Sequence, residues 1–468
     1  MCTELKADCV YREPGVKLDA GDKLILERLN RIESMLKSGY TVPTPSTTAG
    51  GVLSPAASNG TAEESSPKHV NHALGPGVTP LNGLGTWSNA STSNISTMPK
   101  MHTTSAMHLL RWPRIRDLVS KPYDRHVLLQ HEMLRDPLRV PPSPNPDTTN
   151  IGHYVAAFFD RANVWYACVN PNTWRSCYDV ASSQGFTEGP ESCIVLLVLA
   201  LGCAAASGSV SNFRYEPEPP GMDYFALAWK LIPNLLTRHD VVAAQCHFLA
   251  AAYLFYIVRP LEAWNLLSNT STKLQLLLGV DGFLTPASRE LCERVYWNTL
   301  LCESDLLAEL DLPHSGIVSY EETVKLPSGF EKEDQEMPAG RDELWYFLAE
   351  IALRRLLNRV SHLIYANRSA MSSTSALAPL VAELDRQLTQ WYDNLPAAVQ
   401  FPRGRLPTDS PSQTVLRLRY FACRTIIFRP YILAVLTDES AAHDPVVTEN
   451  CRKCLEACVR QIEHVAAQ

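Results

Sequence analysis

The sequence predicts an all-α protein, in which a large helical domain follows a short coiled-coil helix and a disordered linker. From about residue 105 onward, apolar residues recur at helical spacing, and the two-residue alternation typical of strands is nearly absent. Hydrophobic residues make up 46% of the 468 positions, which is enough for a large core. We therefore assign residues 105–468 to one all-helical domain.

Residues 341–365 show the helical spacing most clearly. One stripe of this segment carries its large apolar residues, namely Leu344, Phe347, Leu348, Ile351, Leu356 and Val360. Residues 377–395 and 415–436 repeat the pattern. Clusters of Pro, Gly, Asp and Ser interrupt the domain and predict loops at 137–147, 214–223, 326–340 and 402–412.

Two apolar runs, 193–210 and 241–258, are about as long as a membrane-spanning helix. Each also contains Ser, Gly, Gln or His, and neither has a clear basic flank. We therefore interpret both as buried helices of the large domain, with a membrane span as the alternative. His247, inside the second run, is predicted to be a core histidine with its hydrogen bonds satisfied rather than a ligand.

The N-terminus and the composition point to a reducing compartment. No apolar stretch follows Met1, so we expect no secretory signal. The 13 cysteines are then expected to be reduced thiols of a cytosolic or nuclear protein. The formal net charge of −7 argues against broad phosphate binding by the whole chain, although a small basic module stays compatible with it.

Residues 18–38 predict a dimerising coiled coil. Its seam is spaced 4, 3, 4, 3, 4 and consists of Leu18, Asp22, Ile25, Leu29, Ile32 and Leu36. Asp22 is a polar residue in this seam and should weaken its first turn. A lone amphipathic helix packed on the domain is the alternative. The linker at 39–104 favours the coiled coil, because Ser, Thr, Pro, Gly and Asn fill 37 of the 60 positions in 41–100 and predict disorder.

Motifs of the common enzyme classes are missing from the sequence. It has no phosphate-binding loop ending in Gly-Lys-Ser/Thr, no G-x-G-x-x-G and no G-x-S-x-G. His131-Glu132 begins a zinc-protease motif, but Arg135 stands where its second histidine is needed. We expect no catalytic residues and no enzymatic activity.

Two clusters of side chains in the helical domain are of types that can bind a metal ion. Acidic residues gather at Glu303, Asp305, Glu309 and Asp311. In a helix, Asp305 and Glu309 share a face that the other two do not, so we favour ordinary surface or buried-network roles over a magnesium site. Cysteines recur on one helical face at Cys451, Cys454 and Cys458. We expect these thiols to pack rather than to bind metal, because one helix cannot easily wrap three ligands around a tetrahedral ion.

The first residues carry a family resemblance. Cys2 and Cys9 are spaced C-x6-C and are followed by an aromatic residue, Tyr11. This resembles the last cysteine pair of the fungal Zn(2)-Cys(6) binuclear cluster, whose pattern is C-x2-C-x6-C, a spacer, and C-x2-C-x6-C. The order of cluster, linker and coiled coil is also that of these dimeric regulators. Residues 1–17 are therefore interpreted as a remnant of such a cluster and its linker.

A second resemblance lies in the helical domain. Arg294, Tyr296, Trp297, Glu303 and Pro313 follow the spacing of the central signature of the fungal-specific transcription factor regulatory domain. The signature reads R-x-W-W, then an acid, then G-R-P, so this chain departs from it at Tyr296 and Glu303 and in the two residues before Pro313. Further similarity lies in the segments 391–396, 418–420 and 428–430. We interpret the signature as fold-specifying, with Pro313 ending the helix.

The resemblance implies a nuclear RNA polymerase II transcription regulator that binds specific DNA sequences. In the full-length form, six cysteines would hold two zinc ions, and the coiled coil would set the spacing of two half-sites. The implied partners are DNA, a second copy or a related chain, and the transcription machinery, with no membrane. The helical domain would regulate activity and could sense a metabolite.

Two thiolates alone cannot complete a tetrahedral zinc site, which needs four ligands. We therefore expect that Cys2 and Cys9 of this polypeptide do not hold zinc by themselves, and that it does not bind an operator by the family's mechanism. Two alternatives stay open. One is an all-α enzyme or small-molecule-binding protein, and the other is a dimerising coregulator that does not bind DNA.

Overall fold

The computed structural model describes residues 113–118, 125–208, 218–280, 282–310, 312–328, 341–366 and 374–466. Within these ranges the chain is helical and contains no strand, which confirms the predicted fold class. Cys2, Cys9, the seam at 18–38 and the linker at 39–104 lie outside the described residues. The predictions made for those segments therefore stay predictions.

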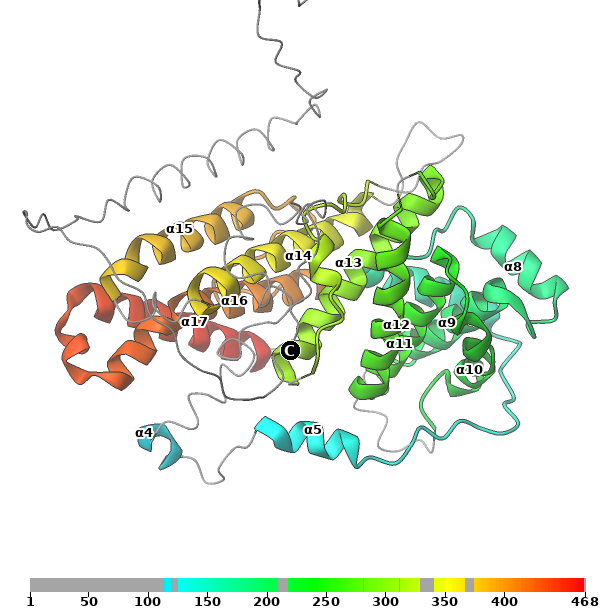
Figure 1. Ribbon diagram of the computed structural model, residues 1–468, viewed down its shortest axis with the longest axis horizontal. Helices are drawn as coiled ribbons and strands as arrows, with labels where there is room; N and C mark the ends of the chain where they lie inside the picture. The colour runs from blue at the N-terminus through cyan, green and yellow to red at the C-terminus, as the bar shows by residue number, and fades with distance from the viewer. Residues whose placement is uncertain are drawn as a thin grey trace, which may run out of the picture. The chain divides into compact units, whose positions relative to one another are not determined.

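The helices follow one another along the chain, and longer connections precede α6, α10, α14 and α16 (Figure 1). The first part comprises α4 (Pro113–Arg116), α5 (Arg125–Met133), α6 (Ile151–Ala157), the π-helical turn η2 (Phe158–Ala162), α7 (Asn163–Tyr166), α8 (Trp174–Ser183), α9 (Gly189–Ala206), α10 (Met222–Leu236), α11 (Val241–Tyr256) and α12 (Pro260–Leu278). The second part comprises α13 (Pro286–Glu309), η4 (Ile317–Tyr320), α14 (Arg341–Val360), η5 (Ser361–Ala366), α15 (Thr374–Asp393), α16 (Pro411–Thr437), η7 (Glu439–His443) and α17 (Pro445–Ala466).

Capping residues explain where several long helices begin. Asp240 accepts a hydrogen bond from the backbone N–H of Ala243 at 2.8 Å and so caps α11. Thr285 caps α13 and Ser410 caps α16 in the same way, and each is followed by a proline at the first helical position. A short polar side chain followed by proline satisfies the free N–H groups at a helix start and sets its backbone angle.

Two hydrophobic cores hold the domain together. The first gathers residues from α6 through α13, and the second gathers residues from α15, α16 and α17. Helix α14 contributes to both: Phe347 and Ile351 belong to the first core, whereas Leu353 and Val360 belong to the second. Figure 1 shows α13 and α14 between the two groups of helices. The chain thus builds two cores that meet along α14.

Helices α9 and α11 are the buried helices that the apolar runs predicted. Nearly all of the side chains of α11 and most of those of α9 are buried in the first core. In the described part of the chain, α9 and α16 are long and apolar enough to cross a membrane. Of their most apolar windows, however, 72% and 50% are buried inside the domain. The described cysteines are all free thiols.

Other helices agree with their predicted spans, with two differences at the ends. The helix predicted at 341–365 is α14, but its last turn widens into η5 from Ser361 onward. The helix of the signature residues, α13, ends at Glu309, and its C-cap is Leu310. The helix therefore stops before it reaches Pro313. The prediction that Pro313 ends this helix is therefore wrong. A backbone turn into extended conformation at Leu310 stops the helix first.

His247 lies in the first core, as predicted, but its hydrogen bonds are not satisfied. Its side chain is fully buried, and neither ring nitrogen has a hydrogen-bond partner among the described residues. Burial and, to a smaller extent, the nearby Lys273 ammonium together lower the pKa of His247 to about 4, and the backbone of Ile232 opposes them. The ring is therefore neutral in the folded protein at physiological pH.

This burial predicts an acid-sensitive fold. In the unfolded chain His247 takes up a proton near its ordinary pKa of 6.5, whereas in the fold it resists protonation until about pH 4. Stability is therefore complete above pH 6.5 and falls as the pH drops from 6.5 toward 4, by up to about 3 kcal/mol. His247→Leu should flatten this decline when urea unfolding is followed across that range.

The matched control is His239→Gln at an exposed position, which should unfold as the parent protein does over the same pH range. An unchanged acid decline in His247→Leu would assign the effect to other groups.

Candidate functional site

Arg294 joins α13 to the loop that follows α7. Its side chain is 2% exposed, its Nε donates to Glu290 Oε1 at 2.8 Å, and its Nη1 donates to the carbonyl of Ala167 at 2.7 Å. Ala167 has a left-handed backbone with φ of 46°. A charge-assisted bond to this carbonyl helps to hold an otherwise unfavourable conformation.

The aromatic pair of the signature secures the segment that follows α13. The Tyr296 hydroxyl donates to the carbonyl of Ile317 at 3.2 Å, and Trp297 Nε1 donates to the carbonyl of Lys325 at 2.8 Å. The two rings are buried and meet edge to face with centroids 5.1 Å apart. Each ring thus contributes apolar area and satisfies its polar edge on the backbone.

Glu303 and Pro313 act on the same segment. Glu303 is buried, and its Oε1 accepts the backbone N–H of Ser315 at 2.7 Å. Burial raises the pKa of Glu303, while its bonds with Ser315 oppose the rise. The carbonyl of Pro313 accepts from Trp264 Nε1 at 3.3 Å. All five signature residues therefore bond to, or lie in, segments that join the long α-helices, including η4.

An ion network joins the two cores where α13, α14 and α16 meet. Asp305 Oδ2 accepts from Arg419 Nη2 at 2.7 Å, and its Oδ1 contacts both Arg419 and Arg354. Arg419 also pairs with Glu350 Oε1 at 2.8 Å. The side chain of Arg354 is 4% exposed, whereas that of Asp305 is 45% exposed. Two carboxylates thus face two guanidinium groups, and the network is neutral.

The pKa of Asp305 reflects its partners. Burial alone would raise it, but the Arg354 and Arg419 guanidinium groups outweigh burial and hold the pKa below its ordinary value. Its carboxylate is thus committed to two arginines rather than free for a cation. In the predicted acidic cluster, Glu303 accepts a hydrogen bond from Ser315 and Asp305 pairs with the two arginines. Glu309 is exposed, so these three carboxylates do not converge on one site.

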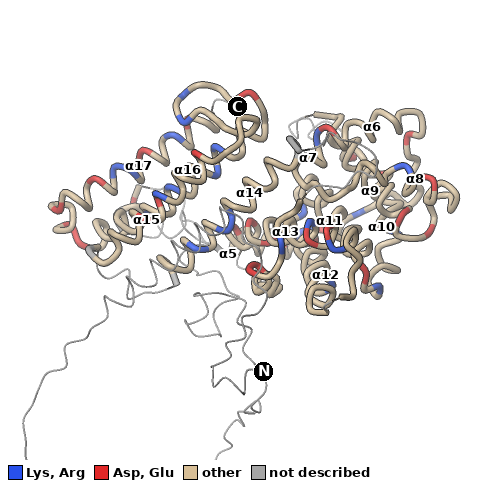
Figure 2. Tube along the Cα trace, turned by 90° about the horizontal axis from the view of Figure 1, so that it is seen from above, with Lys and Arg blue, Asp and Glu red and all other residues tan. Residues whose placement is uncertain are grey.

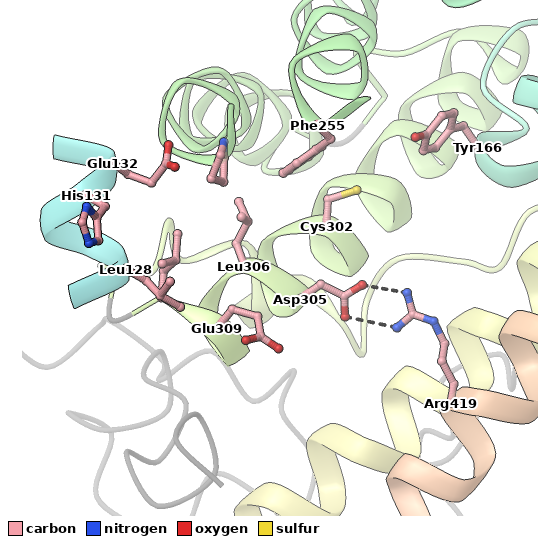
Figure 3. Close-up of a pocket in the computed structure, with 12 residues that line it drawn as sticks. Leu128, His131, Glu132, Tyr166, Phe255, Cys302, Asp305, Leu306, Glu309 and Arg419 are labelled. Carbon is pink, nitrogen blue, oxygen red and sulfur yellow. Dashed lines mark hydrogen bonds and ion pairs between the residues drawn. The ribbon is translucent and has the colours of Figure 1, made fainter. Parts of the chain in front are cut away.

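A pocket of about 550 Å³ lies beside this network. Figure 3 shows α5 along one side of it, α13 along another, and the Asp305–Arg419 pair at its edge. The lining residues are Leu128, His131, Glu132, Tyr166, Phe255, Pro260, Cys302, Asp305, Leu306, Glu309, Leu310 and Arg419. A cavity of this size suits a small organic molecule.

Among the residues that the structure describes, few hydrogen bonds hold the α5 wall of the pocket. Arg135, just after α5, donates to the carbonyl of Val258 and lies 3.3 Å from Glu132. In the opposite direction, Arg259 donates a hydrogen bond to the carbonyl of Asp136, just after α5, at 2.6 Å. Leu128 on α5 is 41% exposed, so this helix is only partly packed against the domain. The pocket therefore has one lightly anchored wall.

Comparison with known proteins identifies the protein family of this chain. The model of the fungal specific transcription factor domain matches residues 155–393, which is about half of the chain. This chain belongs to that family. A curated relative, "Putative transcription factor ecdB" of Aspergillus rugulosus, is 24% identical over 355 residues. That match covers 67% of this chain and 57% of the relative, so the chain spans less than two thirds of the relative's length. No solved structure matches the chain.

The fungal specific transcription factor domain includes most of the site. Arg294, Tyr296, Trp297, Glu303 and Pro313 all lie inside the matched span, as do the pocket residues of α7, α11, α12 and α13. The α5 wall and Arg419 lie outside it. The resemblance predicted from the signature is thus confirmed for the regulatory domain.

Metal ligands are not brought together in the described part of this family member. No group of three or more His, Cys, Asp or Glu residues there could hold a metal ion. On α17, Cys454 is buried and contacts the carbonyl of Thr425 at 3.6 Å, and Cys458 lies 3.6 Å from its hydroxyl. These thiols pack against α16.

Sequence reasoning missed the arginines of the network. Arg354 and Arg419 lie 49 and 114 residues from Asp305, and no spacing rule links them. Arg419 stands in a segment that resembled the family, but its partner could be found only from the fold. The α5 wall carries no family motif and was also missed.

Proposed function

We propose that this chain acts in the nucleus as a transcription regulator that binds DNA through a zinc cluster and does not catalyse a reaction. Membership of the fungal specific transcription factor domain family is the observation that carries the regulatory part. The Cys2-x6-Cys9 spacing supports the zinc cluster, in which these residues would be two of six thiolate ligands.

The order of segments supports a dimer on DNA. In this proposal the seam at 18–38 pairs two copies, or one copy and a related chain, and fixes the distance between two half-sites. The helical domain then has a regulatory role, including contact with the transcription machinery. Zinc is the one cofactor of the proposal, and it belongs to the DNA-binding module.

Charge in the helical domain favours a separate DNA-binding module. Figure 2 shows acidic and basic residues mixed along α15 and α17. Helix α16 carries arginines and no acidic residue, but Arg419 and Arg424 pair with acidic side chains of neighbouring helices. Several of these charges pair with one another, as Arg386 does with Glu383 and Arg452 with Glu449. Phosphate binding needs a concentration of unpaired positive charge, which these helices do not offer.

A mobility-shift assay tests the proposal. The probe is a duplex with inverted CGG half-sites, and the protein is compared with and without an N-terminal extension that supplies four further cysteines in the family's pattern. We expect retardation only with the extension, because four thiolates are needed around each zinc ion. Specific retardation by the chain without the extension would contradict the zinc-cluster mechanism.

A further inference from the structure

We propose that the pocket between α5, α11, α12, α13 and α16 binds a small amphipathic cation, that is, an apolar molecule with one protonated amine. The inference does not depend on DNA binding, because ligand binding itself is the readout. It combines the size of the pocket, the chemistry of its walls and the balance of its charges.

The walls of the pocket suit an apolar body. Phe255 of α11, Leu306 and Leu310 at the end of α13, and Leu128 of α5 supply the larger apolar surfaces. Leu306 and Leu310 belong to the first core, so this wall is rigid. Because α5 is lightly anchored, the opposite wall can adjust to the occupant. A mainly apolar lining with a few polar groups is typical of small-molecule sites.

The charges of the pocket disfavour an anion. Three carboxylates line it, those of Glu132, Asp305 and Glu309, against one guanidinium, that of Arg419. Arg419 is already bound by Asp305 and by Glu350. An incoming anion would have to displace Asp305, which would leave the nearly buried Arg354 without its carboxylate. The pocket therefore discriminates against acids.

Glu309 is the available partner for a cation. Among the described residues it forms no hydrogen bond or ion pair, whereas Glu132 is paired with Arg135. Glu309 is exposed and lies on α13 one turn after Asp305, on the same face. Figure 3 shows its carboxylate beside Asp305 and opposite α5. An amine at this position would gain a carboxylate without breaking the ion network.

The far end of the pocket offers one neutral polar contact. Figure 3 shows the Cys302 thiol turned toward Tyr166, with the Tyr166 hydroxyl on the side of Phe255. This hydroxyl forms no hydrogen bond with another described residue, and burial raises the pKa of Tyr166, so it remains a neutral donor. A carbonyl or hydroxyl on the apolar body would find its partner here.

Three probes with one chain and different head groups test the inference. Isothermal titration calorimetry of the full chain compares n-octylammonium, 1-octanol and octanoate. We expect n-octylammonium to bind about fivefold more tightly than 1-octanol, as one solvent-exposed charge pair allows. Octanoate should bind more weakly than both.

Variants locate the two parts of the site. Glu309→Gln should weaken n-octylammonium by about fivefold and leave 1-octanol unchanged. Leu128→Ser should weaken all three probes by about threefold, because it removes apolar area from the exposed wall. Glu188→Gln, at an exposed position before α9, is the matched control and should change nothing.

The inference is overturned by any of three results. These are equal affinity for the three probes, no binding up to their solubility limits, or a preference for the amine that Glu309→Gln leaves intact. Circular dichroism of each variant confirms that the helical content is unchanged.

Discussion

Asp305→Asn is expected to lower the free energy of unfolding by about 2–3 kcal/mol. The substitution keeps the shape of the side chain but removes the charge that Arg354 and Arg419 share. The Arg354 side chain is 4% exposed and would be left without its carboxylate. The loss is smaller than for a fully buried pair, because the Asp305 side chain is 45% exposed. Urea unfolding measures it.

Asp179→Asn provides the matched control for this prediction. Asp179 pairs with Arg175 one helical turn away, and both side chains are well exposed. Such a surface pair contributes about 0.5 kcal/mol or less. If Asp305→Asn cost no more than Asp179→Asn, the network would not be what joins α13 to α14 and α16.

Gly202→Ala is expected to destabilise the first core by about 3 kcal/mol. Gly202 lies inside α9 where α6 crosses it closely. An added Cβ would collide with the carbonyl oxygen of Tyr154. It would lie 2.8 Å from the carbonyl carbon of Tyr154 and 3.3 Å from Phe158 Cβ. The first obstacle is backbone, so one of the two helices would have to move. Thermal and urea unfolding both report the change.

Gly152→Ala should have the opposite sign. Gly152 lies in α6, and a Cβ built there meets nothing within 4 Å. Alanine restricts the unfolded chain and favours the helix, so a gain of about 0.5 kcal/mol is expected. Equal effects of the two substitutions would contradict the close contact between α6 and α9.

Local periodicity made much of the fold predictable. The spacing of apolar residues in 341–365, 377–395 and 415–436 placed α14, α15 and α16, because one face of each helix is buried. The positions at which helices end were harder to predict from the sequence. Leu310, which is not a residue that usually stops a helix, ends α13 through its extended backbone rather than through Pro313.

The signature residues could be recognised in sequence, but not their partners. Arg294, Tyr296 and Trp297 bond to backbone carbonyls of Ala167, Ile317 and Lys325, and carbonyls carry no sequence pattern. The expectation of satisfied hydrogen bonds at His247 failed for a related reason. Burial was visible in the apolar run, but the position of nearby carbonyls was not.

The pocket could not be predicted from the sequence, for a different reason. Its residues come from helices that are distant along the chain, from Leu128 on α5 to Arg419 on α16. The contacts that assemble them depend on how two cores meet along α14. Neither residue lies in the part matched by the family model.

We propose that DNA recognition resides in a zinc cluster to which Cys2 and Cys9 contribute. The decisive measurement is retardation of the inverted-CGG duplex by the extended chain, with and without Cys9→Ser. The proposal predicts zinc-dependent retardation that Cys9→Ser and a chelator each abolish, because a tetrahedral site missing one thiolate does not fold the module. Retardation that survives both treatments would contradict it.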